Sequence, residues 1–146
     1  MRKLLAFCAL AVMTLAGRPL ALNAAEALCP LQNATLRGTY LSHGTGTIVG
    51  VGPISAVGSA TYDGNGSTSN TFTASVNGTI HKDVTVTGIY TVNPDCTGSL
   101  AQNGSHYEFV VAPDGSTVFW IATDNGLVFS GSQARTRRDE HEAAVE

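Results

Sequence analysis

The stretch VTVTGIYTVNPDCTGSL, from Val84 to Leu100, decides the fold. Residues 84–92 place valines and a tyrosine on one side and mainly threonines on the other, which is the two-residue period of a β-strand with one buried face. Asn93-Pro94-Asp95 ends that strand, because proline has no N–H to donate to a sheet. The stretch therefore predicts a strand, a tight turn that carries Cys96, and the start of the next strand.

The same unit recurs along the chain, with Gly, Asn and Asp between the alternating segments. Asp63-Gly64-Asn65-Gly66 is the strongest hairpin signal, since Asn and Gly accept the positive φ of a type I′ turn. The expected strands are residues 36–47, 54–62, 68–76, 84–92, 97–101, 107–111, 117–123 and 127–134. Short connections between so many strands predict an all-β fold, a single eight-stranded antiparallel up-and-down barrel of the calycin type. A β-sandwich is the alternative.

Both ends of the chain are expected to lie outside the barrel domain, residues 28–134. Residues 1–27 have the features of a signal peptide, namely a basic start, an apolar run and the A-x-A pattern Ala25-Glu26-Ala27. Competing cleavage sites place the mature N-terminus anywhere from Gly17 to Leu28. Residues 135–146 form a charged C-terminal tail, expected to be solvated rather than a short docking helix. We expect a secreted or periplasmic protein that has no membrane association after cleavage.

The cysteines agree with an exported protein. The chain has three, and Cys8 is removed with the signal, which leaves Cys29 and Cys96. In an oxidising compartment such a pair usually forms a disulfide, and closing this loop stabilises the fold by about 4 kcal/mol. A redox or metal role is disfavoured because there is no C-x-x-C and no third thiol. Lipid attachment at Cys29 is disfavoured because Leu28 is bulky.

Charge and motifs exclude several classes of function. From Cys29 to Ala134 the chain has two basic and six acidic residues, whereas nucleic-acid phosphates require clustered Lys and Arg. The motifs H-E-x-x-H, G-x-S-x-G and the P-loop do not occur. We therefore expect no nucleic-acid partner, no metal and no cofactor. Nothing in the sequence indicates the oligomeric state.

Two motifs carry a resemblance to known proteins. ATYDGNG at Ala60–Gly66 and GIYTVNPDCTG at Gly88–Gly98 resemble segments of small exported bacterial β-barrel proteins, a largely uncharacterised family. More remotely, the pattern is similar to lipocalin-type and allene-oxide-cyclase-like barrels, which hold apolar small molecules in the lumen and sometimes cyclise them. No catalytic residue of those groups matches a position here, so the resemblance implies the fold and, by analogy, a ligand-binding lumen.

Six aromatic residues are the candidate ligand-binding set. On the inner face of a barrel they would line an apolar cavity in which one or two hydroxyls orient a guest, the usual composition of a small-molecule site. In a filled lumen the same side chains would simply be core. The six residues are Tyr40, Tyr62, Phe72, Tyr90, Trp120 and Phe129.

His106, Glu108 and Tyr90 are the candidate catalytic residues. His106 and Glu108 are two positions apart in an expected strand, so they share a face and could act as an acid–base pair or as metal ligands. Their odd-numbered neighbours make a better inner face, which favours the polar outer surface for both. His43 and the cluster His81-Lys82-Asp83 near the barrel rim are weaker candidates.

Three functions agree with these residues. The first is a non-catalytic barrel that binds a small, mostly apolar ligand, which predicts a cavity of at least a few hundred cubic ångströms. The second is a cyclase or isomerase acting on a lipid or polyketide-like substrate, which requires inward-facing acid–base groups. The third is a non-catalytic structural or interaction module, which an exposed apolar patch would favour.

Overall fold

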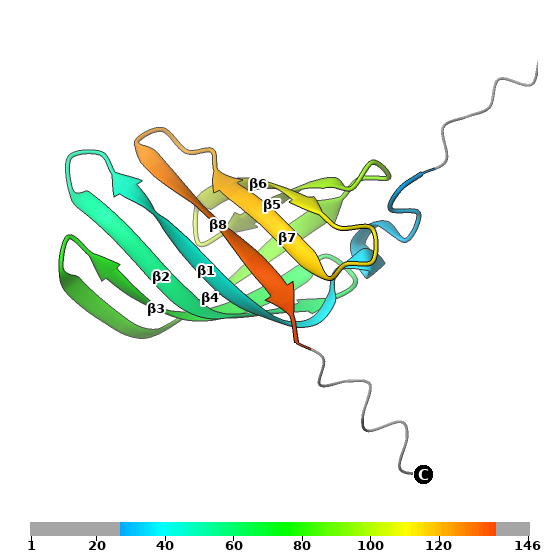
Figure 1. Cartoon of the computed structure of the whole chain (residues 1–146), viewed down its shortest axis with the longest axis horizontal. Coiled ribbons are helices and arrows are strands. Elements are labelled where there is room, and N and C mark those ends of the chain that lie inside the picture. The colour runs from blue at the N-terminus through cyan, green and yellow to red at the C-terminus, as the bar shows by residue number, and fades with distance from the viewer. Residues whose placement is uncertain (1–26, 137–146) are drawn as a thin grey trace, which may run out of the picture.

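The computed structural model describes residues 27–136 and has eight antiparallel strands in one closed barrel (Figure 1). Each strand pairs with its neighbour in the sequence, and the last strand pairs with the first. The strands are β1 (Arg37–Ile48), β2 (Gly52–Asp63), β3 (Ser67–Val76), β4 (Thr79–Val92), β5 (Thr97–Gln102), β6 (Ser105–Val111), β7 (Thr117–Ala122) and β8 (Leu127–Arg135). The predicted up-and-down barrel is confirmed, and the sandwich alternative is wrong. None of the helices in this part of the chain has the length and apolar character needed to cross a membrane.

β4 departs most from the expected boundaries, because it begins at Thr79 rather than at Val84. Its register with β3 shifts between Phe72 and Ala74, and Asp83 has a φ of 54°. A bulge of this kind inserts an extra residue and changes which face the following side chains occupy. The two-residue period is therefore regular only from Val84 to Val92, where the side chains alternate between the inner and outer faces as predicted.

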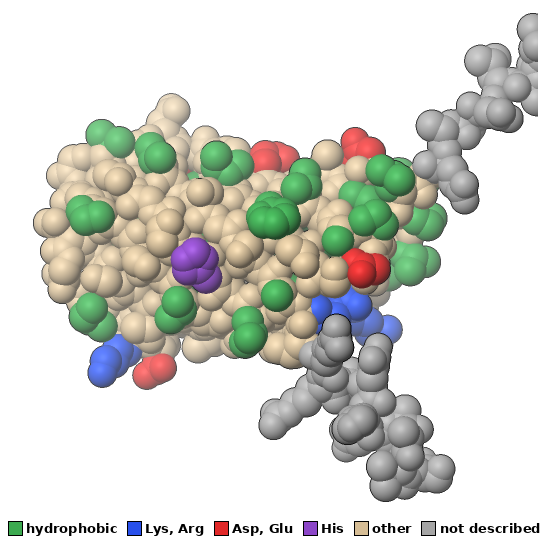
Figure 2. Space-filling view, viewed as in Figure 1, with side chains coloured by type: hydrophobic (Ala, Val, Ile, Leu, Met, Phe, Trp, Pro, Cys, Tyr) green, Lys and Arg blue, Asp and Glu red, His purple; other side chains and the backbone are tan. Residues whose placement is uncertain are grey.

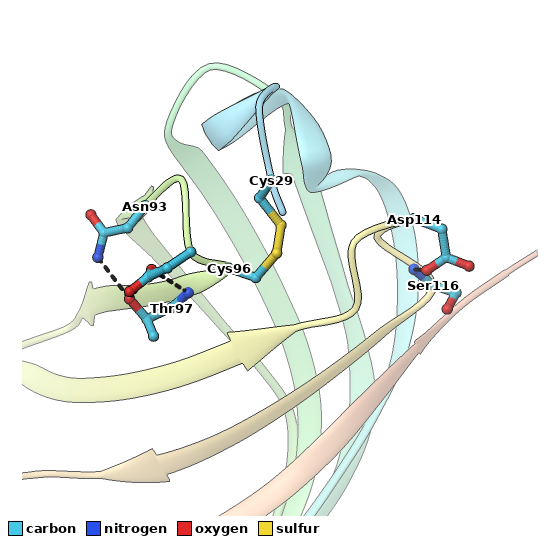
Figure 3. Close-up of a disulfide and its surroundings, with 7 residues drawn as sticks. Cys29, Asn93, Cys96, Thr97, Asp114 and Ser116 are labelled. Carbon is cyan, nitrogen blue, oxygen red and sulfur yellow. Dashed lines mark hydrogen bonds between the residues drawn. A yellow bond between two sulfur atoms is a disulfide. The ribbon is translucent and has the colours of Figure 1, made fainter. Parts of the chain in front are cut away.

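A disulfide closes one end of the barrel. Cys29 and Cys96 are bonded, with their Cα atoms 5.1 Å apart, and join the N-terminal segment to the turn between β4 and β5 (Figure 3). The segment continues into a short 3-10 helix, η1 (Gln32–Thr35), and Asn33 Oδ1 accepts a hydrogen bond of 2.8 Å from the Val92 N–H. The predicted disulfide is confirmed, and it indicates an environment outside the cytoplasm.

The lumen next to η1 is filled by three tyrosines. Tyr62 packs edge-to-face against Tyr40 and Tyr90, with ring centroids 5.2 Å and 5.0 Å apart. All three rings are buried together with Leu36 and Val92. Aromatic pairs prefer this geometry, so the three rings form a solid layer across the barrel. We call Tyr40, Tyr62 and Tyr90 the tyrosine layer.

β8 extends to Arg135, which was expected to be the first residue of the tail. Arg135 Nε donates to Tyr40 Oη at 3.0 Å, and Nη2 donates to the Thr35 carbonyl at 2.7 Å. Arg135 therefore belongs to the barrel and connects β8 to η1 and the tyrosine layer. The expected signal peptide and the rest of the tail lie outside the described residues.

Candidate functional site

A cavity occupies the part of the lumen beyond the tyrosine layer. The volume open to the centre of a water molecule is about 70 Å³. Ala56, Gly58 and Ala60 on β2 contribute little side-chain volume to its wall. The aromatic residues of its lining are Tyr62, Phe72, Tyr107, Phe109, Trp120 and Phe129.

Two glycines explain why Trp120 leaves this space open. Trp120 on β7 pairs with Gly131 on β8, which in turn pairs with Gly44 on β1. A Cβ atom at Gly44 would lie 2.6 Å from Trp120 Cη2, and one at Gly131 would lie 2.6 Å from Cζ2. Glycine in a strand often marks such a close approach. The indole therefore lies against the backbone of two neighbouring strands, where a side chain at either position would push it into the lumen.

Trp120 is also the centre of an aromatic cluster on one wall. Its ring packs against Phe129 at a centroid distance of 5.0 Å and against Tyr107 at 5.6 Å, both edge-to-face. These contacts come from β6, β7 and β8. They hold the indole in one orientation, so this wall of the cavity is preformed.

Three hydrogen-bonded side chains form the floor of the cavity. Tyr62 Oη donates to Gln133 Oε1 at 2.8 Å, and Gln133 Nε2 lies 3.5 Å from Ser42 Oγ. All three residues line the cavity. Burial raises the pKa of Tyr62 far above its ordinary value, although the bond to Gln133 opposes the shift. The hydroxyl therefore stays protonated at physiological pH.

Two of the residues that line the cavity each have a buried polar atom with no protein partner. Among the described residues, no hydrogen bond reaches the buried Asn70 Oδ1 or the buried Trp120 Nε1. Asn70 is on β3 and Trp120 is on β7, which are on opposite sides of a closed barrel with this strand order. Buried polar atoms are paired in the great majority of native structures. Both atoms are almost completely shielded from the open space of the cavity.

The aromatic residues selected from the sequence divide into two groups. Tyr62, Phe72, Trp120 and Phe129 line the cavity, whereas Tyr40 and Tyr90 do not. Tyr40 Oη donates to the Gly115 carbonyl at 2.6 Å, and Tyr90 Oη donates toward the Leu36 carbonyl at 2.9 Å. Both hydroxyls are used to close the η1 end of the barrel, so Tyr40 and Tyr90 are core residues in this structure.

The candidate acid–base pair lies on the outer surface. His106 and Glu108 are exposed on the outer face of β6. His106 Nδ1 contacts Asp124 Oδ1 at 2.8 Å, and the His106 N–H donates to Asp124 Oδ2 at 2.8 Å. Asp124 thus tethers the start of β6 to the turn before β8, and the hydrogen bond from the imidazole lowers its pKa. His106 and Asp124 hold two hairpins together, and neither His106 nor Glu108 lines the cavity.

The two other histidines among residues 27–136 are also outside the lumen. His43 is exposed on the outer face of β1, and His81, Lys82 and Asp83 are exposed in β4, shortly after the Asn77-Gly78 turn. Within residues 27–136 no three His, Cys, Asp or Glu side chains are grouped so that they could hold a metal ion.

Sequence reasoning missed several cavity residues. Asn70, Gln102 and Gln133 line the cavity but were not selected. Each occupies a position that alternates in phase with inward apolar residues, as Asn70 does with Phe72. The sequence could have indicated these residues, because each is a polar side chain at an inward-facing position of its strand. An inward amide is unusual unless it has a hydrogen-bond partner.

The outer surface carries an exposed apolar patch on β6 and β7. Val110, Phe119 and Ile121 are 51%, 62% and 55% exposed, and Val110 pairs directly with Phe119. These three residues are called the β6–β7 patch. Figure 2 shows hydrophobic side chains spread over one face of the barrel among mostly uncharged ones.

Comparisons with protein-family models, curated proteins and solved structures found no match for this chain. The cavity and the surface are therefore interpreted from their geometry and chemistry.

Proposed function

We propose that this protein is an exported, non-catalytic barrel that binds a small, mostly apolar molecule in its lumen. The observation that carries the proposal is the cavity between the tyrosine layer and the wall built by Trp120, which two glycines keep open. Small-molecule sites are typically apolar and aromatic, with a few placed polar groups. The lining residues have this composition, with Asn70, Gln102 and Gln133 among the aromatic side chains.

The size of the cavity restricts the ligand. The 70 Å³ available is smaller than the few hundred cubic ångströms expected from the sequence. An engineered apolar cavity of roughly 150 Å³ binds benzene. The space here is about half as large, so one small ring is the upper limit for the ligand and a lipid does not fit.

The same observations weaken the cyclase or isomerase alternative. His106 and Glu108 face solvent and Tyr90 does not line the cavity, which leaves the hydroxyls of Tyr62 and Tyr107 in the lining. The raised pKa of Tyr62 makes its hydroxyl a poor proton donor, and because it stays protonated it is not a base. Binding without chemistry is the simpler function for this lumen.

Export is part of the proposal. It is supported by the disulfide and by the signal-like residues 1–27, and it agrees with the resemblance to small exported bacterial barrels. The likeness to lipocalin-type barrels supports a ligand in the lumen only as an analogy of fold.

Trp120 makes the proposal easy to test, because it is the only tryptophan in the chain. Titrating the folded protein with toluene and with p-cresol should change the fluorescence and the indole N–H resonance of Trp120. Ala56→Leu, which fills the cavity, should abolish both changes. Ser55→Leu, the adjacent residue on the outer face, is the matched control and should bind as the wild type does. If neither ring changes the Trp120 signals, lumen binding is wrong.

An interaction module is the second candidate, and the β6–β7 patch is the observation that favours it. Exposed apolar residues that lie together often mark a contact surface. Sedimentation of the full chain over a range of concentrations should detect self-association that Phe119→Ser weakens and Thr45→Ser leaves intact. A monomer at all concentrations would remove the case for contact between copies through this patch.

A further inference from the structure

One side of β4 lacks a partner strand for residues 79–87. β4 pairs with β3 from Thr79 to Ile89, whereas β5 pairs only with residues 88–92. The hairpin of β3 and β4 projects past the end of the shorter strand β5 (Figure 1). The other strands are paired on both sides over most of their length. Residues 79–87 are therefore a free sheet edge, which we call the β4 edge.

The backbone of the β4 edge directs hydrogen-bonding groups into solvent. The Tyr90 N–H donates to the Gly66 carbonyl at 2.8 Å, so the backbone polar groups of Tyr90 point to the β3 side. Successive residues of a strand direct these groups to alternate sides. Thr85 and Thr87 are exposed and have the opposite phase, so their N–H and C=O groups point away from β3. Unpaired groups of this kind are a template for pairing with another chain.

A bulge places two opposite charges on the β4 edge. The register with β3 shifts between Phe72 and Ala74, so Lys82 and Asp83 together lie opposite Thr73. Both charged side chains are exposed, and neither makes an ion pair with another described residue. Lysines and bulges often protect a sheet edge from pairing with other chains. Here the lysine is followed directly by an aspartate, so the β4 edge carries no net charge and does not repel an identical edge.

We propose that the partner of the β4 edge is a second copy of this chain, paired antiparallel through the same edge about a two-fold axis. A two-fold contact uses the same surface of both copies, so the edge has to be complementary to itself. The charges meet this condition, because an axis at the bulge brings Lys82 of each copy near Asp83 of the other. An unrelated peptide would need the same two charges in the matching order, whereas a second copy supplies them.

The bulge also makes the side chains match in such a pair. Ile80, before the bulge, pairs with Ser75, which pairs with Ser55 on the outer face. Thr85 and Thr87, after the bulge, are also on the outer face. Directly opposed residues of an antiparallel pair share a face. An axis at the bulge therefore places Ile80 of one copy opposite Thr87 of the other, which covers an isoleucine that is 55% exposed in the single chain.

Sedimentation of the full chain over a range of concentrations tests for the dimer, and a proline variant tests where it forms. Thr85→Pro removes an N–H that faces the open side, where proline is tolerated. Thr85→Ala is the matched control, because it also loses the 3.0 Å contact with Thr71 Oγ1 but keeps the N–H. We expect Thr85→Pro to weaken dimerisation about ten-fold, since a symmetric dimer loses two hydrogen bonds. Thr85→Ala should dimerise as the wild type does.

Amide hydrogen exchange of the wild type is a second measurement, and it needs no variant. The N–H groups of Thr85 and Thr87 should exchange more slowly as the protein concentration rises. The N–H of Thr45, which is in a strand paired on both sides, is the control and should not change.

Three results would overturn the inference. The first is a chain that stays monomeric at all concentrations, and the second is a dimer in which exchange at Thr85 and Thr87 is unchanged. The third is a dimer that Phe119→Ser weakens and Thr85→Pro does not, because the contact would then lie on the β6–β7 patch. None of these results bears on ligand binding in the lumen, which the ring titrations test separately.

Discussion

Tyr62 and Gln133 are 71 residues apart in the sequence, and the hydroxyl of one donates to the side-chain carbonyl of the other at 2.8 Å in the barrel interior. This contact connects β2 to β8, the two strands that flank β1, over the inner face of β1. It separates the tyrosine layer, which closes the η1 end, from the cavity beyond it. The arrangement divides one barrel into a solid half and a hollow half.

Tyr62→Phe removes the donor and leaves Gln133 Oε1 buried without this partner. We expect the free energy of unfolding to fall by about 1–3 kcal/mol, the usual cost of leaving a buried polar group without its hydrogen-bond partner. Denaturation in urea measures the change. The double variant Tyr62→Phe/Gln133→Met should recover much of the lost stability, because no buried side-chain carbonyl is then left without a partner. A double variant as unstable as the sum of the single variants would contradict the coupling.

Gly44→Ala tests the close approach of Trp120. The new methyl group would lie 2.6 Å from Cη2, so the indole must move toward the lumen. We expect a loss of about 1–3 kcal/mol in stability, typical of overpacking, and a shift in the Trp120 emission maximum. Thr45→Ala on the outer face of β1 is the control and should leave the emission maximum unchanged. An unchanged maximum in Gly44→Ala would show that the indole does not pack against this strand.

Replacing both cysteines tests the contribution of the disulfide. The bridge closes a loop with a sequence separation of 67 residues. In the chain-entropy account, a loop of this length stabilises the folded state by about 4 kcal/mol. Urea denaturation of Cys29→Ser/Cys96→Ser should detect a loss of that order, and reduction of the wild type should have the same effect. A reduced wild type as stable as the oxidised protein would contradict the prediction.

Acid should destabilise the barrel through aspartates that accept hydrogen bonds at its turns. Each has a pKa below its ordinary value of 3.8, and the largest cause in each case is a hydrogen bond to the carboxylate. Because the folded pKa is depressed, this stabilisation is present above pH 3.8 and is lost as the pH falls through the folded pKa. The four residues are Asp63, Asp95, Asp114 and Asp124.

The urea midpoint should therefore fall below about pH 4, the ordinary range of an aspartate. Asp124→Asn should make this acid dependence shallower, because one of the four carboxylates no longer titrates. A midpoint that stays constant between pH 7 and pH 3 would contradict the assignment.

The two-residue period predicted the barrel because every strand has one face in the lumen. The predicted strand ends agree with the structure where a turn contains residues with positive φ. Asn77 and Asn103, each with a φ of 47°, follow the ends of β3 and β5 directly. Cys29 and Cys96 were paired correctly because they were the only cysteines left once Cys8 was assigned to the expected signal peptide. The start of β4 was missed because a bulge near Asp83 interrupts the alternation, although the Asn77-Gly78 turn directly precedes the strand.

The site was predicted less completely, for a physical reason. Periodicity assigns a residue to the inner face, but it does not say whether the lumen at that level is filled. Tyr40 and Trp120 share the inner face, yet one is core and the other lines the cavity. The difference arises from Gly44 and Gly131, which come into contact with Trp120 only through strand pairing. That contact depends on register, which alternation alone does not determine.

The most direct measurement of the hollow half of the barrel is diffraction from crystals held under xenon pressure. Xenon enters apolar protein cavities. We predict a xenon peak in the lumen between Phe72 and Trp120 in the wild type, and no peak in Ala56→Leu. A wild-type lumen without xenon, in which aromatic side chains fill the space above Tyr62, would contradict the cavity and the function proposed for it.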